Sequence, residues 1–385
     1  MRFFKCSSFS PEYLRTFYVA NPGVAELDYA RHYAALMTDC YGWADYWKRN
    51  LEATRRFDCA DVVINAAALQ QRWARENGVR WSETDWPLEI LFAQLLRFEP
   101  EVFFAHDVSR ITPDFLRRVR QQIPSIRMIV GWDGVAHCDP PQYSQCDVVL
   151  APVQHIVDFY RRSGFRSHLF TLGFETSILP RIPVVSRQVD CSFVGSIFLG
   201  AHEERFRTVA AIARRHPLDL HLTVSKGRFL RSRLGLVKRG DPGALWRIGQ
   251  SYSDYRLLCR QSRPPLFGRA MYGKLAESRV GLNVHIDAAR DNSGNMRLFE
   301  VTGMGACLLT DRKQNLSELF EEGKEIVVFD NAADAEAKLK ALLADPGRCA
   351  RIAAAGQART MRDHSLARSI DEFTKNFLPA VDAPL

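Results

Sequence analysis

The sequence predicts an α/β protein with two Rossmann-like, doubly wound domains, and three observations lead to this fold class. The chain has 385 residues, which exceeds one ordinary domain and fits two of middling size. Short apolar runs alternate with helical patterns, as is typical of parallel sheets with helical crossovers. This alternation lapses between Gly173 and Val189, where Pro180 and Pro183 interrupt both patterns. We therefore expect an interdomain linker at 176–189.

The N-terminal domain is expected over residues 1–175. Its predicted strands are short apolar runs at 61–65, 102–105, 127–130 and 147–150. A helix is predicted between the second and third strands, because Thr112 can cap its N-terminus and Pro113 suits its first turn. An aromatic-rich stretch before Asp61 is expected to be helical and to belong to the core rather than to a ligand platform.

The C-terminal domain is expected over residues 190–362. Its predicted strands lie at 191–194, 220–224, 280–284, 306–310 and 325–329. Alanine-rich helical patterns follow at about 332–343 and 346–361, and a last helix within 363–385 is expected to pack back on the N-terminal domain. Ligands in doubly wound sheets bind at the carboxyl ends of the strands, so we expect the two domains to face each other across a central cleft.

Composition and cysteine usage narrow the class of protein. Hydrophobic residues make up 46% of the chain and charged residues 25%, as in a globular protein. No segment approaches the roughly 18 consecutive apolar residues of a membrane helix, and the N-terminus has no signal-peptide pattern. The nine cysteines are scattered without a Cys-x-x-Cys pair, which argues against a disulfide framework or a structural zinc site. A cytoplasmic location is expected.

The formal charge of +8 suits an anionic partner, which could be a nucleotide diphosphate, an anionic membrane surface or nucleic acid. The local excess lies at 226–239 and 117–120, where a solvated basic face is an equal alternative. No zinc finger or ribonucleoprotein-type aromatic motif is present, so nucleic acid is not expected. Peripheral contact with an anionic membrane stays open, although no amphipathic anchor is evident.

One candidate phosphate site follows the strand at 191–194. Gly195 and Ser196 are read as the start of a glycine turn before a helix near His202, where a backbone could approach a phosphate closely. The segment is neither a Walker loop nor a dinucleotide fingerprint, because the required spacing is absent. An ordinary strand-to-helix turn is therefore the alternative.

A stronger candidate follows the strand at 280–284. A polar loop leads from His285 into a predicted helix near Gly294, whose first turn would present free backbone N–H groups to a diphosphate. Arg297 and Glu300 are three residues apart and share a helix face; the arginine can neutralise phosphate and the carboxylate can accept hydrogen bonds from a ribose diol. The alternative is an ordinary surface ion pair.

The run from Gly268 to about His364 resembles the C-terminal domain of group-1 glycosyltransferases, in the branch similar to the spore-maturation protein CgeB. The matching segments, which include Asn295-Met-Arg-Leu-Phe-Glu300, lie at 272–285, 295–300, 303–311 and 316–323, and fainter ones at 189–196 and 70–74. The resemblance implies the GT-B fold, with an N-terminal acceptor domain, a C-terminal nucleotide-sugar domain and no obligatory metal or other cofactor.

The resemblance also implies which residues bind the donor. Glu300 matches the acidic residue that holds the donor ribose. The full set of expected donor-binding residues is Gly195, Ser196, Lys226, His285, Asn292, Asn295, Met296, Arg297 and Glu300. Retaining relatives commonly carry a second glutamate eight positions before the ribose ligand, and this chain has Asn292 there, with Asp291 beside it.

The N-terminal domain offers candidates for the acceptor side. His106 and Asp107 follow the strand at 102–105, and Asp133 follows the strand at 127–130, so their side chains are expected at the carboxyl ends of strands. An imidazole or carboxylate there could take the acceptor's proton. A turn or cap role is the alternative for Asp133. The expected catalytic residues are His106, Asp133 and Arg297.

These features predict a glycosyltransferase that moves a hexosyl or related group from a nucleotide diphosphate sugar to an unknown acceptor, with retention. The acceptor can be a glycan, a protein, a lipid-linked intermediate or a small molecule. Two alternatives remain: a nucleotide-sugar epimerase on the same fold, and a nucleotide-sugar-binding protein without catalysis.

Overall fold

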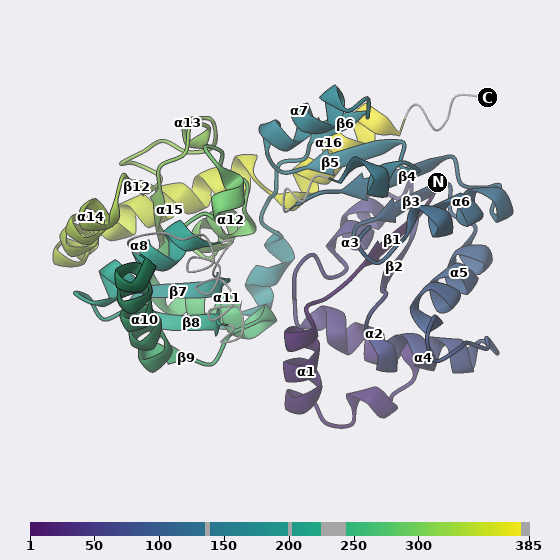
Figure 1. The fold of residues 1–385 in the computed structure, drawn as a ribbon, viewed down its shortest axis with the longest axis horizontal. Coiled ribbons are helices and arrows are strands. Elements are labelled where there is room, and N and C mark those ends of the chain that lie inside the picture. Colours follow the sequence, from purple (N-terminus) through teal and green to yellow (C-terminus); the bar gives the residue numbers. More distant parts are fainter. Residues whose placement is uncertain (135–138, 199–201, 225–243, 379–385) are drawn as a thin grey trace. The chain divides into compact units, whose positions relative to one another are not determined.

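The computed structural model describes residues 1–134, 139–198, 202–224 and 244–378. The chain forms two compact units (Figure 1). The first comprises Met1–Thr171 together with Leu366–Leu385, and the second comprises Leu172–Ser365. The chain therefore passes between the units twice, and its last helix belongs with its first half.

The N-terminal unit is built on a six-stranded sheet in the order β2-β1-β3-β4-β5-β6, in which all neighbouring strands pair in parallel. The strands are β1 (Arg2–Ser7), β2 (Asp58–Val63), β3 (Val102–Ala105), β4 (Met128–Trp132), β5 (Val148–Ala151) and β6 (Ser167–Leu169). The helices are α1 (Pro11–Ala20), α2 (Tyr29–Thr38), α3 (Tyr46–Ala53), α4 (Ala67–Glu76), α5 (Trp86–Phe98), α6 (Pro113–Gln122), α7 (Gln154–Arg162) and α16 (Leu366–Phe377).

Both faces of this sheet are covered. Apolar side chains of α5, α6 and α7 form one core with the strands. On the other face Trp47 of α3 is fully buried and contacts the rings of Phe3, Phe104 and, from α16, Phe373. Of the aromatic-rich stretch before Asp61, Tyr46 and Trp47 are helical and buried, as predicted, whereas Tyr41 and Trp43 precede the helix, and Trp43 lies in a turn.

The N-terminal strands predicted from sequence are confirmed within about three residues at each end, but β1 and β6 were not predicted. β1 is a central strand, and its charged Lys5 breaks the apolar pattern that a buried strand normally shows. Lys5 is nevertheless 1% exposed, because its Nζ lies 2.7 Å from the Asp61 carboxylate of β2 and donates to the Ala44 carbonyl. A local pattern cannot reveal a charge that is neutralised from a neighbouring strand.

The predicted start of α6 is confirmed in detail. The Thr112 hydroxyl accepts a hydrogen bond from the Phe115 backbone N–H, and Pro113 occupies the first helical turn. This capping places the helix directly after the polar loop that follows β3.

The C-terminal unit contains a second parallel six-stranded sheet, in the order β12-β11-β10-β7-β8-β9. Its strands are β7 (Val189–Ile197), β8 (Asp219–Val224), β9 (Ser262–Arg263), β10 (Ser278–Asn283), β11 (Cys307–Asp311) and β12 (Val327–Phe329). Its helices are α8 (Glu203–Ala213), α10 (Ala244–Gln261), α11 (Gly268–Glu277), α12 (Met296–Gly303), α13 (Leu316–Leu319), α14 (Ala332–Ala344) and α15 (Pro346–Asp363).

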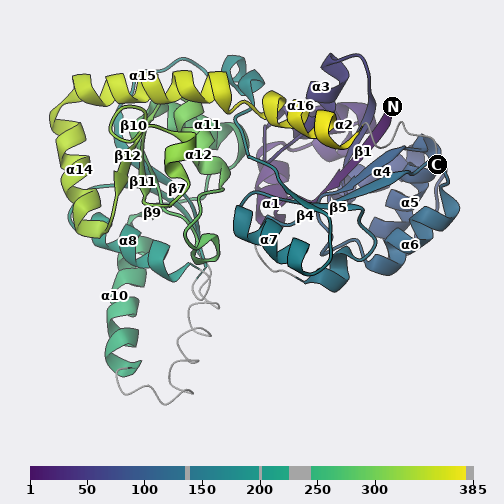
Figure 2. The same cartoon turned by 90° about the horizontal axis from the view of Figure 1, so that it is seen from above.

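Helices lie on both sides of this sheet as well, with α8 and α10 on one side and α11 and α12 on the other (Figure 2). The predicted α/β class with two doubly wound sheets is therefore confirmed. The five predicted strands are all present, and only the two-residue β9 was missed.

One local prediction was wrong. Gly195 and Ser196 do not open a turn, because β7 continues through Ile197 and pairs them with Leu222 and Thr223 of β8. Six consecutive residue pairs join these strands, and this ladder keeps Gly195 extended. A glycine after an apolar run indicated a turn, whereas the cross-strand pairing decided the conformation.

Candidate functional site

The order of strands locates a ligand site in each unit. In an open parallel sheet the favoured site lies at the carboxyl ends of the strands, at the point where the strand order reverses direction. That point falls between β7 and β10 in the C-terminal unit and between β1 and β3 in the N-terminal unit. The predicted donor residues follow or flank the first point, and His106 follows β3 at the second.

The start of α12 lies beside the end of β10. Asn295 is the N-cap residue, and its side chain makes no capping hydrogen bond to the helix. Its amide nitrogen instead donates to Asn283 Oδ1 at 2.8 Å, and Asn283 in turn donates to Thr310 Oγ1 at 2.9 Å. The first-turn N–H groups of Met296 and Arg297 are thus left without their own cap, which suits an anionic ligand.

Glu300 is 7% exposed, and both of its carboxylate oxygens are held. The Tyr272 hydroxyl donates to Oε1 at 3.1 Å, and Arg297 Nη1 lies 2.8 Å from Oε2. The predicted Arg–Glu pair on one helix face is therefore real. Because the carboxylate is buried and positioned by two donors, it is more than an exposed surface ion pair.

His285 lies at the end of β10, is 3% exposed, and is held by Asp311 at the end of β11. Asp311 Oδ1 lies 2.7 Å from His285 Nδ1 and accepts the His285 backbone N–H at 2.9 Å. Burial alone would raise the pKa of the Asp311 carboxyl, but the hydrogen bonds and charge of His285 hold that pKa below its ordinary value. The pair therefore joins the ends of the neighbouring strands β10 and β11.

The helix that follows β7 already has an anionic partner. The Asp287 carboxylate accepts the backbone N–H groups of Glu203 and Glu204 at 2.8 and 3.2 Å, at the start of α8. Arg205 joins the neighbouring strand ends, since it donates to the Ser196 and Val284 carbonyls. Of the two helices that follow β7 and β10, the strands at which the strand order reverses, only α12 therefore begins without a capping carboxylate or side chain in the described residues.

Asn292 is half-buried, and its side chain makes no hydrogen bond within the described part of the chain. The loop around it is fixed by Asn315, whose side chain accepts from and donates to the backbone of Ser293. Lys226, the predicted phosphate cation, lies outside the described residues. The structure thus brings His285, Asn292, Asn295 and the start of α12 together at one sheet edge.

The N-terminal unit has a cavity of about 580 Å³ at the carboxyl ends of β1, β3 and β4. Its lining includes the predicted residues His106 and Asp133, together with Ser8, Asp107 and Ser109. The two predicted acceptor-side residues are therefore brought together around one space, although they are 27 positions apart in the sequence.

The imidazole of His106 is surrounded by aromatic rings. Its centroid lies 4.7 Å from that of Trp43 and 6.0 Å from that of Trp132, with which it is nearly parallel. Desolvation by these neighbours, reinforced by the charge of Lys5, lowers the pKa of His106 to about 3. The imidazole is therefore neutral at physiological pH.

Carboxylates and hydroxyl groups make up the polar side of this cavity. Asp133 is 4% exposed and accepts a hydrogen bond of 2.8 Å from the Tyr160 hydroxyl. Asp107 accepts from the Ser8 hydroxyl and, at 2.5 Å, from the Ser109 hydroxyl. The described lining residues thus offer mainly hydrogen-bond acceptors.

Two further properties concern the described residues as a whole. They contain no group of three or more histidine, cysteine, aspartate or glutamate side chains arranged to hold a metal ion. Among the helices of that part of the chain, none combines the length and apolar character needed to cross a membrane.

Comparison with known proteins bears first on the fold. The HepE protein of Anabaena, solved in complex with UDP-glucose, is 12% identical, with 99% of this chain and 100% of that chain covered and a TM-score of 0.58. Sucrose-phosphate synthase of Thermosynechococcus elongatus is 10% identical, with 99% of both chains covered and a TM-score of 0.56. The chain has the GT-B fold.

A third GT-B neighbour is the UDP-forming α,α-trehalose-phosphate synthase of Burkholderia xenovorans, with 11% identity, a TM-score of 0.52, and 100% of this chain and 99% of that chain covered. At such identities the likeness concerns the fold alone. Residues 239–375 also match a family model described as glycosyl transferase-like, which covers most of the candidate donor site. No curated protein matches the sequence. The CgeB-like branch stays a prediction.

Several contacts in the two candidate sites could not be predicted from the sequence. Tyr272 was part of a recognised segment, but its contact with Glu300 spans 28 positions and has no local signal. Tyr160, the partner of Asp133, lies on a helix that presents an ordinary apolar stripe. Asp287 lies in the polar loop that was predicted after β10, but its role at the start of α8 depends on the packing of two distant segments.

Proposed function

We propose that the protein is a glycosyltransferase that moves a sugar from a nucleotide diphosphate sugar to a hydroxyl group of an acceptor. The observation that carries this proposal is the start of α12, where uncapped N–H groups lie next to a buried, doubly held Glu300. The glycosyl transferase-like match over residues 239–375 supports it. HepE was solved with UDP-glucose, so UDP-sugars are the first donors to test.

In this proposal the C-terminal unit binds the donor. Glu300 accepts hydrogen bonds from the ribose hydroxyls, while the N–H groups of Met296 and Arg297 and the Arg297 guanidinium face the diphosphate. Negative charge develops on the diphosphate as the sugar leaves, and these groups stabilise it electrostatically. Because the charge can be met by protein groups, we propose that transfer needs no metal ion.

The N-terminal unit binds the acceptor in the cavity beside His106. Asp107, Asp133 and the serine hydroxyls can accept hydrogen bonds from alcohol groups, whereas a phosphate would meet carboxylates at close range. We therefore propose an uncharged, hydroxyl-bearing acceptor. Neutral His106 or Asp133 can take the acceptor proton if the reaction inverts configuration. If it retains configuration, the donor phosphate takes that proton, and these residues position the acceptor.

The test is turnover of UDP-sugars, measured as UDP release with and without neutral saccharides or sugar phosphates. We expect release to rise with a neutral saccharide, to persist in EDTA, and to fall at least about 10-fold in Arg297→Gln, because a charge-assisted contact to the diphosphate is lost. Arg279→Gln, which changes an exposed arginine paired with Asp190, is the matched control. Equal turnover in both variants would contradict the proposed role of Arg297.

One residue, Asn292, favours a second function, which is nucleotide-sugar binding without catalysis. Asn292 stands where retaining relatives commonly carry a glutamate, and an amide cannot provide a carboxylate's charge beside the sugar. A nucleotide-sugar-binding protein without catalysis would show donor binding with no UDP release across a broad panel of donors and acceptors. Release that depends on acceptor would rule it out.

A further inference from the structure

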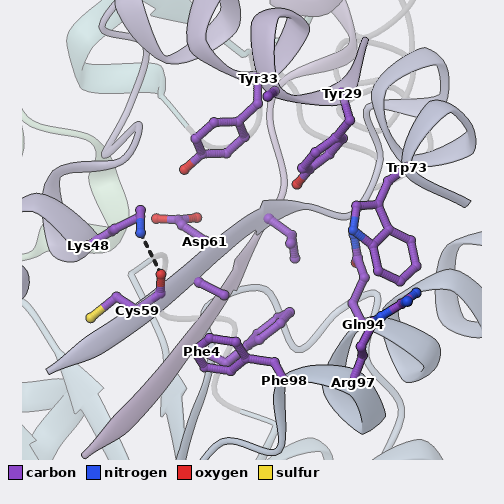
Figure 3. A pocket seen from close by; sticks show the side chains of 13 residues that line it. Phe4, Tyr29, Tyr33, Lys48, Cys59, Asp61, Trp73, Gln94, Arg97 and Phe98 are labelled. Atoms are coloured by element: carbon purple, nitrogen blue, oxygen red, sulfur yellow. Dashed lines mark hydrogen bonds between the residues drawn. The ribbon is translucent and has the colours of Figure 1, made fainter. Parts of the chain in front are cut away.

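A second cavity in the N-terminal unit, of about 420 Å³, lies at the open edge of the sheet beside β2 (Figure 3). Its lining comes from α2, α3, α4 and α5 as well as from β1 and β2. None of its lining residues also lines the cavity beside His106. The edge cavity, as we call it, is therefore separate from the proposed acceptor site.

Five of the thirteen residues that line the edge cavity are aromatic. Figure 3 shows Tyr29 and Tyr33 on one side of the space, Phe4 and Phe98 on the opposite side, and Trp73 between them. Rings in such an arrangement bind the flat or apolar body of a small molecule, and the volume lies within the range of ordinary ligand pockets.

One end of the edge cavity is polar and incompletely paired. The Asp61 side chain is fully buried, and its Oδ2 lies 2.7 Å from Lys5 Nζ. Within the described residues, neither Asp61 Oδ1 nor the Tyr33 hydroxyl has a hydrogen-bond partner, although both atoms are buried. A buried polar atom without a hydrogen-bond partner is destabilising, so a ligand that supplies the partner is bound more tightly at this site.

The charges around the edge cavity select against an ionic ligand. Lys5 already neutralises Asp61, so an ammonium group would compete with it. Lys48 is engaged by Glu52 and by the Cys59 carbonyl, and Arg97 donates to Asn77 at 2.7 Å. An anion would therefore meet the Asp61 carboxylate without a free cation at the polar end, as far as the described residues show.

We propose that the edge cavity binds a neutral, largely apolar molecule whose hydroxyl group hydrogen-bonds to Asp61 and Tyr33. The apolar body lies among the five rings, and the hydroxyl donates to Asp61 Oδ1 while it accepts from the Tyr33 hydroxyl. Both orphaned atoms are satisfied by one group.

The test uses 4-methylphenol, with toluene as the same shape without the hydroxyl and 4-methylbenzoate as an anion. Binding to the full chain is followed by amide chemical-shift changes at millimolar probe. We expect 4-methylphenol to bind at least about 5-fold more tightly than toluene, and 4-methylbenzoate to bind more weakly than either. Tyr33→Phe should shrink the preference for the phenol and leave toluene binding unchanged.

Occupancy of the edge cavity is tested by blocking it. Ala30 lines the cavity from exposed α2, so Ala30→Trp should abolish binding of 4-methylphenol, whereas Ala34→Trp, one turn further along the exposed surface, should not. Glu300→Ala should leave the binding of 4-methylphenol unchanged, because the edge cavity is independent of the proposed donor site. Absence of phenol binding, or binding that survives Ala30→Trp in a folded protein, would overturn the proposal.

Discussion

At the scale of single residues, the Lys5–Asp61 ion pair places two charged side chains in the interior of the first sheet. Both side chains are essentially unexposed, and burial raises the pKa of the Asp61 carboxyl to about 7 despite the opposing charge of Lys5. Such a pair costs much to desolvate, and removal of one partner leaves a charge that nothing compensates.

We therefore expect Lys5→Met to lower the free energy of unfolding by about 3–5 kcal/mol, and the double variant Lys5→Met with Asp61→Leu to recover most of that loss. Urea unfolding of the wild type and both variants measures it. A single variant as stable as the wild type would show that the pair is not buried as described.

His106 gives a prediction on pH. Its pKa is about 3 in the folded protein and about 6.5 when unfolded, so the unfolded chain binds the extra proton between these values. The free energy of unfolding is therefore not reduced by protonation of His106 above about pH 6.5, and it falls as the pH drops from there toward 3. Between pH 7 and 5 the wild type should lose about 1–2 kcal/mol more than His106→Asn. Equal losses by urea titration would contradict the buried, neutral imidazole.

Two of the residues around the start of α12 could be predicted from the sequence, and one of their contacts could not. Glu300 and Arg297 were found because a spacing of three on a helix is a local pattern, and the structure shows them in contact. Their partner Tyr272 could not be found in this way, since only the packing of α11 against α12 brings it near. The roles of all three in binding a donor stay predictions.

At the scale of elements, the position of α12 depends on its close approach to β10. A Cβ atom added at Gly281 would lie 2.5 Å from Val301 Cγ1, so only glycine allows the present distance between helix and strand. The uncapped helix start is therefore held beside Asn283 and His285 by a packing contact at Val301, the residue after Glu300.

Gly281→Ala should accordingly lower the free energy of unfolding by about 1–3 kcal/mol and weaken nucleotide binding, because α12 must shift. A Cβ atom added at Gly273 in α11 would meet no other atom within 4 Å, so Gly273→Ala is the control and should be neutral or stabilising by up to about 1 kcal/mol. Calorimetric melting with and without UDP measures both effects. If both variants behaved alike, the close approach would not matter.

The composition and length of the strands explain which of them could be predicted from the sequence. β3 is apolar throughout, and β10 and β11 contain the short apolar runs Val280–Leu282 and Cys307–Leu309, so all three could be predicted from the sequence. β6 and β9 are three and two residues long at sheet edges, too short for any periodicity to show. β7 was found, but its end was placed too early because pairing with β8 extends it past Gly195.

At the scale of the whole molecule, each unit has one candidate site at the point where its strand order reverses. The alternation of strands and helices was sufficient to predict two such sheets. The return of α16 to the first unit depends on the burial of Phe373 against Trp47, a contact across more than 300 positions. The assignment of donor to one unit and acceptor to the other is our proposal.

In the proposed donor site, the start of α12 and Glu300 bind a nucleoside diphosphate. The decisive test is isothermal titration of the purified protein with UDP, UDP-glucose, ADP and GDP. We predict that at least one of them binds, that Glu300→Ala weakens its binding by about 10-fold or more, and that the exposed control Glu318→Ala leaves it unchanged. If the folded protein bound none of these nucleotides, or if both variants bound as the wild type does, the proposed donor site would be wrong.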